Sequence, residues 1–145
     1  MKRTLLVLIA VSTSFVLGFI ARGALVSAEP APLADRVFEL RTYTAPPGKL
    51  EALKTRFRDH TIRIFKRHNM EAIGYWVPQD PPLNENTLIY VLVHPSREAA
   101  TKNWADFQAD PEWVRVRAES IANGPLTTKT PDSVFLNPAD FSPIK

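Results

Sequence analysis

The sequence predicts an α+β domain, with one small β-sheet covered on one face by two helical segments, that follows a leader segment. Two observations predict the domain. Short runs of β-branched and aromatic residues alternate with two longer runs whose apolar residues recur at helical spacing. The chain of 145 residues, 45% of them hydrophobic, is long enough for one compact core and too short for two ordinary domains.

The leader comprises residues 1–28 and has the layout of a signal peptide. Lys2 and Arg3 precede an apolar run at 4–20, and small residues occupy positions −3 and −1 before a cleavage position after Ala28. The alternative is an uncleaved N-terminal membrane anchor helix, although the run is shorter than the roughly 20 residues that span a bilayer comfortably. We therefore expect an exported protein, periplasmic or secreted, that stays tethered to the inner membrane if the leader is not cleaved.

The charge of the chain is concentrated in the leader. The formal net charge is +3, but Lys2, Arg3 and Arg22 lie in the leader, which has no acidic residue. The rest of the chain has as many basic as acidic residues, so nucleic-acid binding is not expected. The chain has no cysteine, which excludes disulfides, thiolate nucleophiles and zinc–thiolate sites.

The first elements of the domain follow a short tether. Residues 29–36 are rich in Pro and Ala and predict an extended tether, so the domain occupies 37–145. A period-two pattern of β-branched and aromatic residues predicts a strand over 37–44. After a Pro-Pro-Gly break, residues 49–68 predict an amphipathic helix that ends at Asn69, since Asn tolerates the left-handed backbone conformation.

Two further strands are expected after this helix. Residues 71–77 predict the second strand, and 79–86 form a polar loop rich in Pro. Residues 87–93 predict a third strand that is nearly unbroken in apolar character. A strand that is apolar on both faces is expected to be buried on both faces.

The second helical segment has two start signals. Ser96 is a plausible N-cap, and Asp110 followed by Pro111 restarts the helix, which is expected to end near Asn123. Residues 133–136 predict the last strand. The resulting order, β-α-β-β-α-β, is the ferredoxin-like arrangement with both helices on one face of the sheet. The other face needs cover, and a second copy of the sheet is the simplest cover, so we expect a homodimer.

Several short motifs follow one another along the domain. They are Phe38-Glu39-Leu40-Arg41-Thr42-Tyr43 with Pro47-Gly48-Lys49, Phe57-x-x-His60, Gly74-x-Trp76, Trp104-x-x-Phe107-x-x-Asp110-Pro111-Glu112-Trp113, and Pro138 with Phe141-Ser142-Pro143. This ordered set resembles the NIPSNAP family over roughly residues 37–143. One departure is Asn69, where the family pattern tends to have Gly.

The resemblance implies a dimeric α/β barrel and little chemistry. Eukaryotic relatives are associated with mitochondria and with recruitment of partner proteins, which an exported chain would not share. Relatives at the level of fold include cofactor-free monooxygenases, isomerases and haem enzymes, and that analogy concerns the fold alone.

Four of the five candidate ligand-pocket residues come from strands. Glu39, Arg41 and Tyr43 share one face of the first strand, which should be central in the sheet. The charges either form an ion pair that fixes the register of the sheet or the dimer, or line a polar pocket in which Arg41 clamps an anion or a carbonyl group. Trp76 is either a core residue or a pocket wall.

His60 is the fifth candidate. It lies three residues after Phe57 and four before Ile64, and this spacing aims it at the sheet. It is either a buried, hydrogen-bonded structural histidine or a base or ligand in a pocket between helix and sheet.

No metal and no cofactor are expected. The three histidines do not pair at i, i+4 spacing, and neither a phosphate-cradling Gly-rich loop nor a Gly-x-Ser-x-Gly elbow occurs.

The leading hypothesis is a homodimeric module that binds a small ligand or a protein partner. The alternative is a cofactor-free oxygenase or isomerase that acts on a small aromatic or carbonyl compound. A closed core favours the first, whereas a cavity of roughly 300 Å³ or more on which His60 and Arg41 converge favours the second. An assembly subunit would need a large exposed apolar patch beyond the dimer interface.

Overall fold

The computed structural model describes residues 36–145. The predicted signal peptide or anchor at 1–28, and the tether at 29–36 except for its last residue, lie outside the described residues. Within 36–145, no helix is long and apolar enough to cross a membrane.

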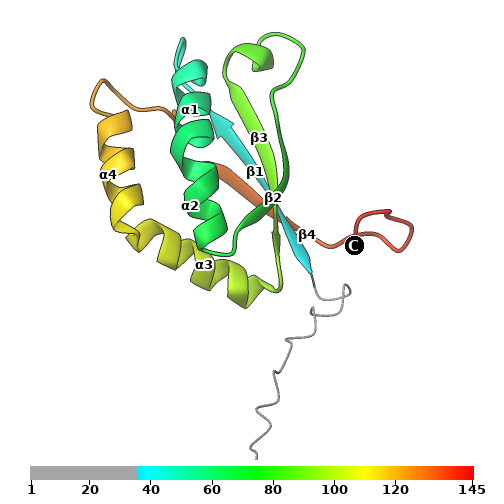
Figure 1. Ribbon diagram of the computed structural model, residues 1–145. Helices are drawn as coiled ribbons and strands as arrows, with labels where there is room; N and C mark the ends of the chain where they lie inside the picture. The colour runs from blue at the N-terminus through cyan, green and yellow to red at the C-terminus, as the bar shows by residue number, and fades with distance from the viewer. Residues whose placement is uncertain (1–35) are drawn as a thin grey trace, which may run out of the picture.

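The sheet has four antiparallel strands in the order β2-β3-β1-β4. These strands are β1 (Val37–Thr44), β2 (Glu71–Trp76), β3 (Thr87–His94) and β4 (Asp132–Leu136). Figure 1 shows the helices together on one face of this sheet. This topology confirms the predicted ferredoxin-like arrangement, and it places β1 between two neighbours, as expected for a central strand.

The first helical segment contains a π-helical turn. It consists of α1 (Leu50–Arg56), η2 (Phe57–Thr61) and α2 (Ile62–Arg67). The amide of Ile62 donates to the carbonyl of Phe57, five residues earlier, and the Thr61 hydroxyl donates to the Arg56 carbonyl. Such a turn adds one residue to the helix and rotates everything after it.

The π turn corrects the expectation for His60. Thr61 is buried and His60 is only half-buried, so Thr61 takes the buried position that regular helical spacing assigned to His60. The sequence pattern gave no sign of the extra residue. Asn69, in contrast, adopts φ 56°, so the predicted left-handed end of the helix is confirmed.

The predicted helix caps are both present. Ser96 Oγ accepts a hydrogen bond from the amide of Ala99 at the start of α3 (Arg97–Ala109). Asp110 Oδ1 accepts from the amides of Glu112 and Trp113 at the start of α4 (Pro111–Ser120). Because each cap bonds to amides close to it in the sequence, both could be placed from the sequence. The end of α4 was predicted less accurately, since α4 ends at Ser120, three residues before the expected end.

A cluster of paired charges fastens α2 to the junction of α3 and α4. We call Arg63, Arg67, His68, Asp110 and Glu112 the Asp110 cluster. Asp110 Oδ2 lies 2.7 Å from both Arg67 Nη2 and His68 Nε2, and Glu112 pairs with both arginines. Hydrogen bonds from His68 and then Arg67 hold the pKa of Asp110 well below its usual range. Arg63 and Arg67 lower the pKa of Glu112 to about 2.

The two faces of the sheet differ in composition. The face under the helices is aromatic: Tyr43 and Tyr90 from the strands pack with Phe57, Phe65 and other rings from the helices. The other face, here called the open face, is mostly aliphatic. Its large side chains are Phe38, Leu40, Trp76, Ile89, Val91, Val93, Val134 and Leu136.

The third strand is buried on one of its two sides within the single chain, and burial of the other side would require the expected second copy. In the single chain, Leu88, Tyr90 and Leu92 are buried under the helices. Ile89 and Val91, which alternate with them, are only half-buried because no helix of the described residues covers them.

Candidate functional site

A buried carboxylate organises the centre of the helix-covered face. Glu39 on β1 is 1% exposed. Its oxygens lie 2.7 Å from Trp104 Nε1, 2.6 Å from Ser133 Oγ, 3.0 Å from His94 Nε2 and 3.0 Å from Arg41 Nη1. We call these five residues the Glu39 cluster. The Glu39–Arg41 contact is the ion pair within the sheet that was one of the two expectations for these charges.

The surroundings of Glu39 keep it ionised. Burial acts to raise the pKa of this carboxyl, but hydrogen bonds from His94, Ser133 and Trp104 and the charge of Arg41 lower it to about 2. A buried carboxylate needs such compensation, because an unpaired ion in the interior is costly.

Arg41 connects the Glu39 cluster to open space. Its guanidinium lies 4.6 Å from the centre of the Trp104 ring and 5.8 Å from that of Tyr43. One Nη holds Glu39, whereas the buried Nε has no hydrogen-bond partner among the described residues. Tyr43 in turn accepts a hydrogen bond from the Tyr90 hydroxyl at 3.1 Å. The predicted group Glu39, Arg41 and Tyr43 is therefore brought together on one face.

A cavity of about 880 Å³ lies beside Arg41, between β1, the helices and the loop at 124–131. We call it the arginine cavity. Four basic side chains line it, namely Arg41, Arg56, Arg117 and Lys129, and no Asp, Glu or His of the described residues does. Its aromatic walls are Tyr43, Trp104, Phe107 and Trp113. The lining therefore combines positive charge with flat apolar surfaces.

Arg56 is the most unusual residue of this lining. It is 8% exposed, and its only side-chain hydrogen bond within 36–145 runs from Nη1 to the Ser120 hydroxyl at 3.3 Å. The guanidinium lies 5.2 Å from the Trp113 ring centre, and its buried Nε has no partner. No carboxylate of the described residues pairs with it. Burial, and then the charge of Arg117, lower the pKa of Arg56.

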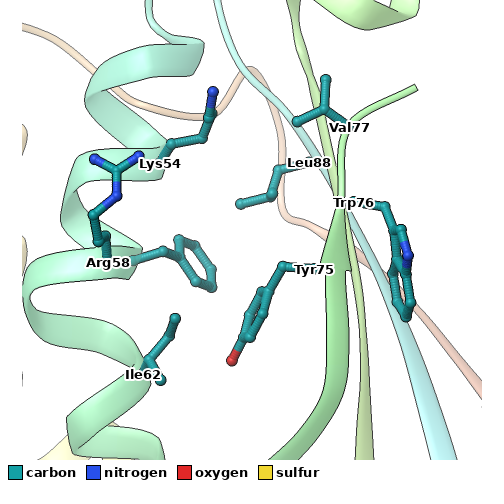
Figure 2. Close-up of a pocket in the computed structure, with 8 residues that line it drawn as sticks. Lys54, Arg58, Ile62, Tyr75, Trp76, Val77 and Leu88 are labelled. Atoms are coloured by element: carbon teal, nitrogen blue, oxygen red, sulfur yellow. The ribbon is translucent and has the colours of Figure 1, made fainter. Parts of the chain in front are cut away.

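A second, smaller cavity of about 230 Å³ lies between the first helical segment and the edge strand β2. In Figure 2, Lys54 and Ile62 extend from the helix toward Leu88 and Tyr75, and Arg58 runs along the helix. The lining is apolar apart from the two cationic groups at its rim.

The two remaining candidate residues lie apart from the Glu39 cluster. His60 lines neither cavity, and no side-chain hydrogen bond of His60 is present among the described residues. Trp76 touches the smaller cavity, but Figure 2 shows its ring pointing away from the helix. The ring lies over Gly74, where a Cβ atom would come within 2.8 Å of it.

Sequence reasoning missed Arg56, which was not among the five candidate residues. A signal was present, because Arg56 lies three residues after Leu53 and next to Phe57, on the apolar stripe of the helix. A charged residue on such a stripe is expected to reach a partner or a pocket.

Within 36–145, no three His, Asp or Glu side chains are grouped so that they could hold a metal ion.

Several solved structures are similar to this chain. A NIPSNAP-like domain protein from Burkholderia xenovorans is 24% identical, with 76% of this chain and 90% of that chain covered and a TM-score of 0.66. A NIPSNAP family protein of unknown function from Agrobacterium tumefaciens is 26% identical, with 77% and 96% covered and a TM-score of 0.66. A putative antibiotic biosynthesis monooxygenase from Caulobacter crescentus shares the fold alone, at 12% identity, coverage of 74% and 93%, and a TM-score of 0.50.

The match to a family is more specific than the match of fold. None of the curated proteins compared with the chain matches it. The NIPSNAP family model matches residues 38–143, and this range includes all five residues that the sequence suggested for the site. Since this match covers more than half of the sequence, the chain belongs to the NIPSNAP family.

Proposed function

We propose that this protein is an exported, homodimeric NIPSNAP-domain module that holds a small ligand in the arginine cavity. The volume of about 880 Å³ carries this proposal. Pockets for small molecules span roughly 300–1,000 Å³ and are lined mostly by apolar and aromatic groups with a few polar ones. The arginine cavity falls within this volume range and has aromatic walls, but its lining is more polar than that of such pockets and it is open to solvent. The smaller cavity falls below this range.

The open face supports the homodimer. Its apolar side chains come from all four strands, with Trp76 on β2 48%, Val134 50% and Leu136 40% exposed. Exposed apolar patches of this kind are typical of protein–protein interfaces. A second copy of the sheet presents an equally aliphatic surface, and a two-fold arrangement would cover both at once.

The homodimer is tested by native mass spectrometry of the full chain, produced with its leader and purified after export. We expect the mass of two copies. Replacing Val134 on the open face by Lys should shift the protein to the monomer, because a charge in an apolar interface is costly. Leu83→Lys is the control, since Leu83 is 52% exposed and lies outside the four strands, in the short helical turn Leu83–Glu85. A monomeric wild-type protein contradicts the proposal.

The same spectra test for a ligand. Protein purified from its own host under non-denaturing conditions should carry a reproducible additional mass, released on denaturation. A stable dimer that is always free of added mass, and that binds no small molecule in solution, would move the function toward partner binding.

The alternative of a cofactor-free oxygenase or isomerase needs a base beside the substrate. His60 was the expected base, and it lies outside both cavities, whereas Arg41 does line the larger one. Because the described lining also lacks Asp and Glu, a binding role fits the arginine cavity better than proton abstraction. Turnover of a retained ligand by the purified protein would favour the enzyme instead.

Export rests on the sequence of residues 1–28. Fractionation of the producing cells should place the protein outside the cytoplasm, and N-terminal sequencing should show whether cleavage follows Ala28. Recovery of the intact chain in the soluble cytoplasm contradicts the proposed localisation.

A further inference from the structure

We infer that the ligand of the arginine cavity is an organic carboxylate with a flat, apolar body. This inference rests on the proposed function, namely that the cavity holds a small ligand, and it adds the chemical class.

The charge of the lining is the first observation. The lining contains four basic and no acidic side chains, although the chain beyond the leader has equal numbers of both. Two of the four have carboxylate partners, since Arg41 pairs with Glu39 and Lys129 with Asp132. Within 36–145, neither Arg56 nor Arg117 has one. The lining of the cavity therefore carries positive charge that the described side chains do not compensate.

The burial of Arg56 is the second observation. Arg117 is exposed and can be solvated by water, but Arg56 is 92% buried, as its 8% exposure shows. A buried charge without a partner is unfavourable, and the Ser120 hydroxyl replaces little of the lost hydration. An anion in the cavity would provide the missing partner.

The orientation of the guanidiniums indicates which anion. Arg41 lies on Trp104, and Arg56 lies on Trp113, so each planar group is held against a ring. The buried Nε atoms of both arginines are unpartnered within the described residues. Because these Nε atoms are buried, a ligand in the cavity would meet the Nη groups, and two N–H groups of one planar guanidinium match the two oxygens of a carboxylate.

The apolar residues of the lining indicate the shape and polarity of the rest of the ligand. Tyr43, Phe107, Ile121 and Leu126 supply apolar surface around the charged groups. Rings favour flat partners through offset or edge-to-face packing. The lining includes only one glycine, Gly124, and so offers no cradle of consecutive amides of the kind that holds phosphate.

Isothermal titration calorimetry on the full-length protein tests the inference. The probes are benzoate, naphthalene-2-carboxylate and biphenyl-4-carboxylate, each compared with its carboxamide, which has the same shape without the charge. We expect at least one carboxylate to bind about tenfold or more tightly than its carboxamide. Binding by none of the three carboxylates, or equal binding of a carboxylate and its amide, overturns the inference.

Variants of Arg56 test whether this residue causes the preference for the carboxylate over the carboxamide. Arg56→Met should remove the preference for the carboxylate, and Arg56→Lys should restore only part of it, because Lys cannot present two parallel donors. The control is Arg115→Met on α4, since Arg115 pairs with Glu119 and does not line the cavity. A preference that survives in Arg56→Met contradicts the inference.

The inference and the proposed function fail in different ways. A neutral molecule retained in the exported protein, or carboxamides that bind as well as carboxylates, leaves the ligand-binding function and overturns the carboxylate. Failure of every probe together with the absence of a retained mass overturns both.

Discussion

Two halves of one helical segment place arginines in opposite surroundings. Near its C-terminal end, Arg63 and Arg67 have side chains 57% and 43% exposed, and both pair with carboxylates of the Asp110 cluster. Near the middle, Arg56 is 8% exposed and has no carboxylate partner within the described residues. Arg63 and Arg67, which are partly exposed, are paired, whereas the nearly buried Arg56 is not.

This difference separates a structural role from a binding role. The Asp110 cluster fastens α2 to the helix junction, and its charges are satisfied by the protein itself. A buried, unpaired Arg56 contributes little to folding, because desolvation of the charge costs more than one hydroxyl contact returns. Proteins tolerate such costs at binding sites, where a ligand offsets them.

The largest expected effect concerns Glu39, because its loss would leave Arg41 as unpaired as Arg56. Glu39→Gln removes the charge from a buried site with four hydrogen-bonding partners. We expect the free energy of unfolding to fall by about 3–5 kcal/mol, measured by urea denaturation. Glu51→Gln, on the exposed side of α1, is the control and should leave stability unchanged. A loss no larger than the control's would show that the Glu39 cluster is not structural.

The pH dependence of stability gives a second test of the role of Glu39. The pKa of Glu39 is lowered from 4.5 to about 2, so its stabilising contribution is complete above pH 4.5 and is lost as the pH falls from 4.5 toward 2. The contribution is on the order of 3 kcal/mol. The stability difference between the wild-type protein and Glu39→Gln should therefore shrink over this range. A difference that stays constant from pH 6 to about 2.5 contradicts the assignment.

Replacement of single arginines by Met should give effects of opposite sign. Arg56→Met should raise the free energy of unfolding by about 1 kcal/mol, since an apolar side chain of similar length replaces an unpaired buried charge. Arg67→Met should lower it, because Asp110 and Glu112 would lose a partner. Both are measured by denaturation without ligand. Two changes of the same sign would erase the distinction between the two halves of the segment.

The smallest effect is expected at His60. It is half-buried and lines neither cavity. His60→Ala should change stability by about 0.5 kcal/mol or less and leave carboxylate binding unchanged. Loss of binding in this variant would restore His60 as a pocket residue and weaken the assignment to the arginine cavity.

The fold followed from local signals in the sequence, whereas the site depended on distant ones. Ser96, Asp110 and Asn69 act on their own neighbours along the chain, and each was placed correctly. The π turn arises from one extra residue in a regular pattern, and it moved His60 off the buried face. No periodicity reveals such an insertion before the helix packs.

The arginine cavity illustrates the remaining limit. Arg41 was a candidate for either an ion pair or a pocket because it shares one face of a central strand with Glu39. Arg56 and Trp113 lie 57 residues apart and meet only when α4 packs beside α1. Residues of the loop at 124–131 also line the cavity. These contacts are made by tertiary packing, so the sequence pattern could not specify the lining.

The most direct test measures unfolding of the wild-type protein and Arg56→Met with and without a saturating amount of the tightest-binding carboxylate. A ligand that binds only the folded state stabilises it in proportion to its affinity. Without ligand, Arg56→Met should be the more stable protein; with the carboxylate, the wild-type protein should gain stability and overtake it. Equal gains in both proteins, or a variant that is less stable without ligand, would contradict the account.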